Sequence, residues 1–182
     1  DVGVSEEEIR MMVDVGSEKG VIDTIEKDMI QNVFEFDSTT VSEFATHRKD
    51  MIVLLMEESV EEWEKVIHES RHTFYPICNK NVDDIVGILD IKDYFRLTDK
   101  NREDVLKSAV KSAYFIPKSV CANVVFKQMK KNHNHIAVVV DEYGGVEGIV
   151  TMNDLLEQIV GELEDECSQE PTSVEIDNNI AN

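Results

Sequence analysis

The chain has 182 residues, of which 42% are apolar, and this is enough to fill one compact domain or two small domains that share a core. Its 18 basic and 38 acidic residues give a formal net charge of -20. Such a field repels the phosphate backbone of nucleic acid and the surface of an anionic membrane, so nucleic acid is not an expected partner. Any bound anion would need local cations, helix N-termini or a divalent ion such as magnesium.

The three cysteines, Cys78, Cys121 and Cys167, are odd in number and lack CxxC spacing, which argues against a disulfide framework or a zinc site and predicts a reducing compartment. No apolar run approaches the roughly 20 residues that span a bilayer, and no signal segment is present. The sequence begins at Asp1 without a methionine. We therefore expect a piece of a longer protein, whose membrane domain would lie outside this sequence.

Residues 1–40 are predicted to form an acidic helical lead-in. Ser5 and Glu8 have the spacing of a capping box, and the stripe Ile9, Met12 and Val13 follows. A second helix is indicated by apolar residues spaced at three and four, namely Ile22, Ile25, Met29, Ile30 and Val33. The acidic outer face is interpreted as a solvated surface.

From residue 41 the sequence repeats itself, because Gly-Ile-Leu-Asp-Ile-Lys-Asp-Tyr-Phe at 87–95 is answered by Gly-Ile-Val-Thr-Met-Asn-Asp-Leu-Leu at 148–156. Each copy, 41–100 and 101–166, is predicted to run strand, helix, strand, strand, helix. Copies of about 60 residues bury little surface alone, so the two should pair. The prediction is a mixed α/β (α+β) fold of two pseudo-symmetric repeats, each a small sheet with packed helices. A linker or disordered tail is expected over 167–182.

The end of the second copy carries the most informative motif. Its stretch Asp141 to Gly145 is predicted to be a hairpin turn, because glycines accept positive φ. In Gly148-x-x-Thr151-x-x-Asp154, a hydroxyl and a carboxylate share one helical face where a strand gives way to a helix. Beside the amides of a helix N-terminus, these groups can hold a ribose diol and a phosphate. The structural alternative is that Thr151 and Asp154 only cap the helix.

Two such copies with a Gly-x-x-[Ser/Thr]-x-x-Asp ending resemble a tandem pair of CBS domains, the Bateman module. Further segments narrow the resemblance to the hemolysin-like CorC/HlyC family, whose relatives include the CNNM transport proteins. They are Asn32-Val33-Phe34-Glu35-Phe36, Thr46-His47-Arg48-Lys49-Asp50, Asp84-Ile85-Val86-Gly87-Ile88-Leu89, Tyr114-Phe115-Ile116-Pro117, Val140-Asp141-Glu142-Tyr143-Gly144-Gly145 and Glu157-Gln158-Ile159-Val160-Gly161-Glu162. The resemblance covers nearly all of the chain up to about Glu166.

The resemblance implies a regulatory module at the cytosolic face of the cell membrane. Such modules usually follow a transmembrane domain and often precede a small C-terminal domain, in proteins linked to magnesium or cobalt transport. They commonly form flat homodimers through their CBS pairs. They commonly bind an adenine nucleotide, here AMP, ADP or ATP, in the cleft between the two copies, often with magnesium; no cofactor is otherwise required.

Carried over by position, Thr151 and Asp154 match the ribose-binding pair, Thr46 matches a residue at the base or phosphate edge, and Pro76 matches the cleft wall near the adenine. Secondary candidates around the cleft are His72, Phe74, Ile116 and Ile149.

The chain departs from the family pattern at two positions. Phe74 stands at the usual arginine position, so a phosphate contact is missing and AMP, ADP or an adenosine-like ligand is favoured over ATP. His47 replaces the usual proline and would partly restore positive charge near acidic pH.

In the first copy, Asp90 replaces the hydroxyl residue and is paired with Asp93. Two carboxylates on one face repel each other and repel phosphate, which predicts an empty or cation-dependent site and at most one nucleotide per chain. The pairs His68/His72 and His133/His135 lack a clear third ligand, so no metal ligands are assigned.

No catalytic triad, P-loop or nucleophile elbow is present, so an enzyme is not expected. Two rivals to nucleotide sensing remain open. One is a dimerisation scaffold whose cleft is vestigial because Phe74 and Asp90 spoil it. The other is direct sensing of divalent cations by the acidic surface.

Overall fold

The computed structural model describes residues 3–161, which contain seven α-helices and eight strands. The helices are α1 (Glu6–Glu18), α2 (Thr24–Phe36), α3 (Val60–Ser70), α4 (Ile91–Arg96), α5 (Arg102–Ser108), α6 (Ala122–Asn132) and α7 (Met152–Val160). The strands are β1 (Thr46–His47), β2 (Leu54–Leu55), β3 (Phe74–Cys78), β4 (Ile85–Asp90), β5 (Val110–Lys111), β6 (Phe115–Pro117), β7 (Ile136–Val140) and β8 (Val146–Thr151). Short 3₁₀ turns occupy Val41–Glu43 and Arg48–Asp50.

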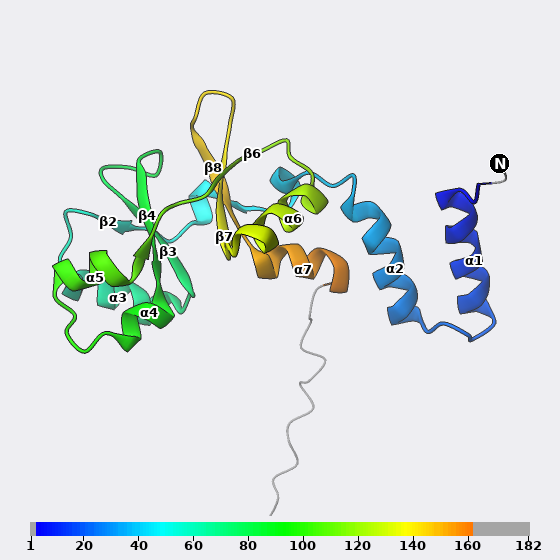
Figure 1. Cartoon of the computed structure of the whole chain (residues 1–182), viewed down its shortest axis with the longest axis horizontal. Helices are drawn as coiled ribbons and strands as arrows, with labels where there is room; N and C mark the ends of the chain where they lie inside the picture. The colour runs from blue at the N-terminus through cyan, green and yellow to red at the C-terminus, as the bar shows by residue number, and fades with distance from the viewer. Residues whose placement is uncertain (1–2, 162–182) are drawn as a thin grey trace, which may run out of the picture.

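The predicted fold class is confirmed: two small sheets with packed helices lie side by side, preceded by a helical lead-in (Figure 1). The first repeat runs β2, α3, β3, β4, α4 and the second runs β6, α6, β7, β8, α7, which is the predicted order in both copies. In the first repeat, β2 pairs in parallel with β3, and β3 pairs antiparallel with β4. In the second repeat, β6 pairs in parallel with β7, and β7 pairs antiparallel with β8. The tail expected over 167–182 lies outside the described residues.

Each sheet is completed by a two-residue strand from the sequence range predicted for the other repeat. The sheet orders are β1-β8-β7-β6 and β2-β3-β4-β5, so β1 joins the second-repeat sheet and β5 joins the first-repeat sheet. Helix α5, just before β5, also buries Val105 in the first-repeat core. The sequence pattern revealed none of β1, β5 and α5.

The motif glycines provide the space for these exchanged strands. A Cβ added at Gly148 would lie 2.1 Å from the carbonyl oxygen of Thr46 on β1. At Gly87, its equivalent in the first repeat, a Cβ would lie 2.6 Å from a methyl group of Val110 on β5. Glycine therefore begins each motif because the neighbouring strand lies too close there for a Cβ.

Three clusters of buried side chains hold the body together. The first-repeat core surrounds Trp63, which is fully buried and donates from Nε1 to the carbonyl of Leu55 at 2.9 Å. The second-repeat core includes Val125 and Met129 of α6. A third cluster joins the two sheets and takes residues from both repeats: Met51, Ile88, Ile136, Val138 and Val146.

The hairpin turn predicted after β7 is present. Asp141 accepts hydrogen bonds through Oδ1 from the backbone N–H groups of Tyr143 and Gly145, at 2.9 and 2.8 Å, and Gly144 has φ of 81°. The loop stands out from the top of the molecule in Figure 1.

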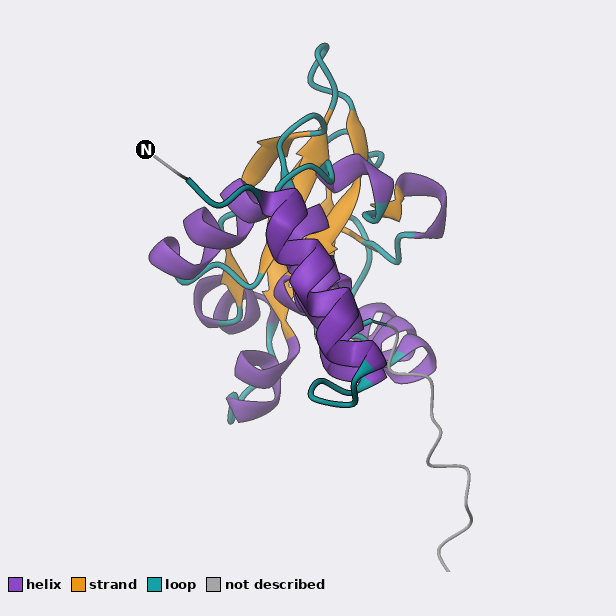
Figure 2. Cartoon of the chain, turned by 90° about the vertical axis from the view of Figure 1, so that its right-hand side faces the viewer, coloured by secondary structure: helices purple, strands orange, loops and turns teal. Residues whose placement is uncertain are grey.

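The lead-in helices α1 and α2 form a hairpin that projects from the second repeat (Figures 1 and 2). The predicted capping box of Ser5 and Glu8 is present. Val13 is buried, but Met12 is 70% exposed, so the predicted stripe is only partly covered. Asn32 of α2 donates to the carbonyl of Ile159 on α7 at 3.1 Å. Over residues 3–161, no helix is long and apolar enough to cross a bilayer.

Gly148→Ala should destabilise the fold by about 3 kcal/mol, at the upper end for overpacking, because the new methyl group meets backbone. Gly87→Ala should cost less, since its closest contact is a side chain. Gly3→Ala, with nothing within 4 Å, is the control. Urea unfolding of the three variants measures the ranking. Equal losses at positions 87 and 148 would contradict the role assigned to the crossing backbone.

Candidate functional site

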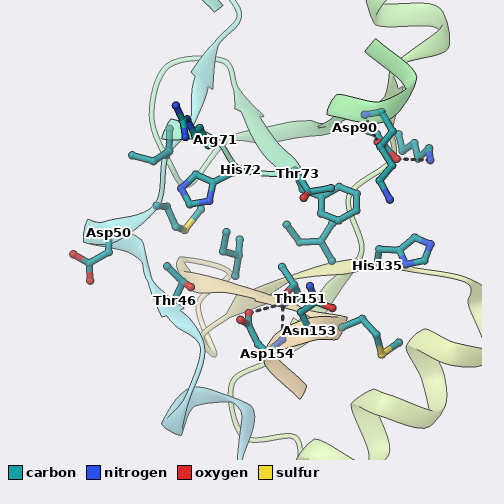
Figure 3. Close-up of a pocket in the computed structure, with 18 of the residues that line it drawn as sticks. Thr46, Asp50, Arg71, His72, Thr73, Asp90, His135, Thr151, Asn153 and Asp154 are labelled. Atoms are coloured by element: carbon teal, nitrogen blue, oxygen red, sulfur yellow. Dashed lines mark hydrogen bonds and ion pairs between the residues drawn. The ribbon is translucent and has the colours of Figure 1, made fainter. Parts of the chain in front are cut away.

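A cavity of about 580 Å³ opens between the two repeats (Figure 3). Its walls come from the first-repeat segments 71–74 and 90–92, the second-repeat segment 149–154, and the residues around β1. The lining residues are Thr46, Asp50, Met51, Ile52, Arg71, His72, Thr73, Phe74, Asp90, Lys92, Lys111, His135, Ile136, Ile149, Thr151, Met152, Asn153, Asp154 and Glu157. The lining thus combines apolar side chains with charges of both signs.

The structure brings most of the predicted site residues together. Thr46, Thr151 and Asp154 line the same part of the cavity, and we call these three the second-repeat half-site (Figure 3). The secondary candidates His72, Phe74 and Ile149 also line the cavity.

Two predicted residues do not line this cavity. Pro76 is buried on β3, where it pairs with Ile88 of β4. Ile116 is 2% exposed and packs in the second-repeat core.

Thr151 and Asp154 form a capping box at the start of α7. The backbone N–H of Thr151 donates to Oδ2 of Asp154 at 2.8 Å, and the backbone N–H of Asp154 donates to Oγ1 of Thr151 at 3.1 Å. The structural alternative left open by the sequence is therefore realised. Oδ1 of Asp154 accepts no hydrogen bond from the described residues, so capping leaves that oxygen available to a ligand.

The equivalent positions in the first repeat are filled differently. Asp90 corresponds to Thr151 and Asp93 to Asp154 by the repeat, and Lys111 corresponds to Thr46 by sheet register. Thr46 pairs with Ile149, whereas Lys111 pairs with Ile88, the residue equivalent to Ile149. We call Asp90, Asp93 and Lys111 the first-repeat half-site.

The repulsion expected between the carboxylates of Asp90 and Asp93 is offset by the ammonium group of Lys111. Its Nζ lies 3.0 Å from Oδ2 of Asp90 and 3.1 Å from Oδ2 of Asp93. Oδ1 of Asp90 accepts from the backbone N–H of Lys92 at 2.9 Å, which caps α4. Burial raises the pKa of Asp90, but the hydrogen bonds from Lys111 and Lys92 outweigh it and hold that pKa below its ordinary value.

Basic side chains in the cavity were missed from the sequence. Arg71, Lys92 and Lys111 all line it, although Phe74 stands where the family carries arginine. Arg71 follows the last residue of α3 in a left-handed conformation, with φ of 53°. The only sequence signal that could have pointed to Arg71 was its position directly after a helix with an apolar face. Phe74 instead stacks on His135, with ring centroids 6.1 Å apart and planes 8° apart.

The interface is also held by an ionic clamp. Arg48, two residues after Thr46, donates from Nη1 and Nη2 to the carboxylate of Asp83 at 2.9 and 3.0 Å. Nη1 also donates to the carbonyl of Val146, whose own N–H donates to Asp83, both at 2.9 Å. The hydrogen bond from Arg48, followed by that from Val146, lowers the pKa of Asp83. The clamp ties a first-repeat turn to the start of β8.

Across residues 3–161, no three His, Cys, Asp or Glu side chains are grouped so as to hold a metal ion. The histidine pairs noted in the sequence therefore receive no third ligand within that range.

Comparison with known proteins places this architecture among tandem CBS pairs. The family model described as "CBS domain" matches residues 41–99 and 122–161, one match in each repeat. The UPF0053 protein Rv2366c of Mycobacterium tuberculosis is 35% identical over 173 aligned residues, and the match covers 93% of this chain and 40% of that protein. The magnesium and cobalt efflux protein CorC of Salmonella typhimurium is 32% identical over 165 residues, 90% of this chain and 56% of that protein.

Solved structures agree with this placement. The CBS domain of a bacterial CNNM/CorC family Mg2+ transporter is 33% identical with a TM-score of 0.79, and the match covers 90% of this chain and all of that one. A CBS domain of that family in complex with ATP is 32% identical with a TM-score of 0.68, covering 76% of this chain and 99% of that one. The chain belongs to the CBS domain family, as a tandem pair of the hemolysin-like CorC/HlyC type related to CNNM proteins.

Lys111→Met should lower the free energy of unfolding at neutral pH by about 1 to 2 kcal/mol, the range for hydrogen bonds to a charged group with one exposed partner. Because the folded-state pKa of Asp90 is depressed, this stabilisation is present above the unfolded-state pKa and is lost as the pH falls through the folded-state value. The difference from wild type in urea unfolding should therefore shrink between about pH 7 and pH 3.

Lys92→Met is the matched control, since Asp90 bonds the backbone of Lys92. It should change stability little at either pH. A Lys111→Met deficit that stayed the same at both pH values would show that the ion pair is not its source.

Proposed function

We propose that this chain is the regulatory CBS pair of a membrane ion transporter of the magnesium and cobalt type, and that it senses an adenine nucleotide in the cleft between its repeats. The observation that carries the proposal is the convergence of Thr46, Thr151 and Asp154 on one cavity of about 580 Å³. Support comes from the similarity to CorC of Salmonella typhimurium and to a CBS domain solved with ATP. The transmembrane domain would belong to the rest of the protein, since this chain spans only 40% of the UPF0053 protein Rv2366c and 56% of CorC.

In this proposal, Asp154 accepts hydrogen bonds from the ribose hydroxyls through its carboxylate, while Thr151 and Thr46 bond the sugar and the base or phosphate edge. Apolar lining residues such as Ile149 and Met51 would cover the base. Arg71 and Lys92 offer positive charge for phosphate, which weakens the argument from Phe74 against ATP. Magnesium would accompany a di- or triphosphate, because the chain carries a net charge of -20. The role is binding rather than catalysis.

The route from ligand to transporter would begin at α7. Asp154 and Thr151 cap its first turn, and its last turn bonds α2 through Asn32 and Ile159. A nucleotide that prefers one arrangement of the repeats would shift the position of the lead-in helices by population shift.

We further propose a homodimer through the CBS pairs at the cytosolic face of the membrane, with a C-terminal domain where the full protein has one.

The test is a thermal-shift and calorimetry panel of AMP, ADP and ATP, each with and without magnesium. Binding at one hundred times the dissociation constant should add about 2.7 kcal/mol of stability. Asp154→Ala should weaken binding at least about a hundredfold, because two charge-assisted hydrogen bonds are lost. Asp154→Asn keeps a capping acceptor and should also bind weakly.

Glu62→Ala is the matched control, since Glu62 closes the capping box of α3 and does not line the cavity. It should lose stability without losing the nucleotide response. The proposal fails if no nucleotide changes the melting temperature, or if Asp154→Ala binds like wild type.

A dimerisation scaffold with a vestigial cleft is the second candidate. It is favoured by the capping box, which gives Thr151 and Asp154 a structural role without a ligand. It predicts a persistent dimer in light scattering that no nucleotide in the panel stabilises.

A further inference from the structure

We propose that Lys111 is a built-in occupant of the first-repeat half-site, so that the cleft accepts one nucleotide and accepts it only at the second-repeat half-site. This inference rests on the proposed function and adds its stoichiometry and the residue that determines it. It replaces the idea of an empty, repulsive pair of carboxylates with a pair that the chain itself neutralises.

The first step is the equivalence of the exchanged strands. Strand β1 delivers Thr46 beside Ile149, and β5 delivers Lys111 beside Ile88. Both side chains reach the same cavity from opposite repeats. The chain therefore places a short hydroxyl at one half-site and a long cation at the other.

The second step is the hydrogen-bonding capacity of the carboxylates. Asp90 is 7% exposed, and both of its oxygens are engaged, Oδ1 by the N–H of Lys92 and Oδ2 by the ammonium of Lys111. The same ammonium bonds Oδ2 of Asp93 at 3.1 Å. A ribose diol would have to displace this ammonium, which would leave Asp90 without a counter-charge and Asp93 with only the exposed Arg96, whose Nη1 lies 3.8 Å from Oδ1 of Asp93.

The third step is the contrast with the second-repeat half-site. Thr151 stands in place of Asp90, and the Asp154 carboxylate receives only the capping hydrogen bond from the Thr151 N–H among the described residues. No cation occupies it in residues 3–161. The two half-sites have one layout and differ in whether the chain supplies its own ligand.

The strand connections set the expected strength of an opened first-repeat site. Residues 48–53 join β1 to β2, and only residues 112–114 join β5 to β6. The shorter connection offers less wall to a base, so the opened site should bind about tenfold more weakly than the natural one, a difference of roughly 1.4 kcal/mol.

The test is calorimetric stoichiometry with AMP and, separately, with ATP and magnesium. Wild type should bind one nucleotide per chain, and Asp154→Ala none. The double variant Asp90→Thr with Lys111→Thr copies the residues at 151 and 46, and should bind two. Adding Asp154→Ala to it should leave one, at the opened site. Circular dichroism and thermal melting check folding, and the pair Asp90→Asn with Lys111→Met replaces the threonine pair if that pair does not fold.

The outcomes separate the two proposals. If wild type binds one nucleotide and the double variant still binds one, lost on Asp154→Ala, Lys111 is not the barrier although the sensing site stands. If wild type binds two, the inference is overturned. If wild type binds none and the triple variant binds one, Lys111 is confirmed as the occupant while the proposed natural site is wrong. No binding by any variant contradicts both.

Discussion

The crossing of β1 over Gly148 and of β5 over Gly87 is the contact on which the rest of the structure depends. Each crossing adds a strand from outside one repeat to that repeat's sheet, so the repeats cannot separate without breaking backbone hydrogen bonds. The same crossings deliver Thr46 and Lys111 to the cavity. The fold and the candidate site thus have one cause, the close approach of a neighbouring strand to a position where glycine leaves the space.

This arrangement explains why the sequence predicted the two repeats but not the short strand that each sheet takes from outside its own repeat. The apolar faces of α3 and α6 recur in the sequence because each must cover a sheet, and Trp63 and Val125 are buried as that pattern indicates. Strands β1 and β5 have two residues each, too few to show alternation, and β1 has its partner about one hundred residues away. Their pairing is a tertiary property that no local pattern encodes.

The candidate site likewise has a part that the local sequence pattern predicted and a part that it did not. Thr151 and Asp154 could be found because a hydroxyl and a carboxylate three residues apart at a helix start are a local feature. The charge balance of Asp90 and Asp93 could not, because the neutralising Lys111 lies on β5, outside the motif. The position of Arg71 at the cavity could not be predicted either, since it depends on the left-handed conformation that Arg71 itself adopts directly after α3. Electrostatic conclusions from local sequence fail where the counter-charge arrives through tertiary contacts.

The two half-sites show how a duplicated layout acquires one function. A buried carboxylate must be neutralised or hydrogen-bonded, and the first repeat meets this requirement with Lys111. In the second repeat, one carboxylate oxygen of Asp154 accepts the hydrogen bond that caps α7, and the other oxygen can accept a hydrogen bond from a ligand. An anionic ligand there must offset the field of a chain with a net charge of -20, and Arg71 and Lys92 supply only part of that. In the function proposed above, nucleotide affinity would therefore depend on a divalent cation such as magnesium, one of the two ions in the name of the related CorC protein.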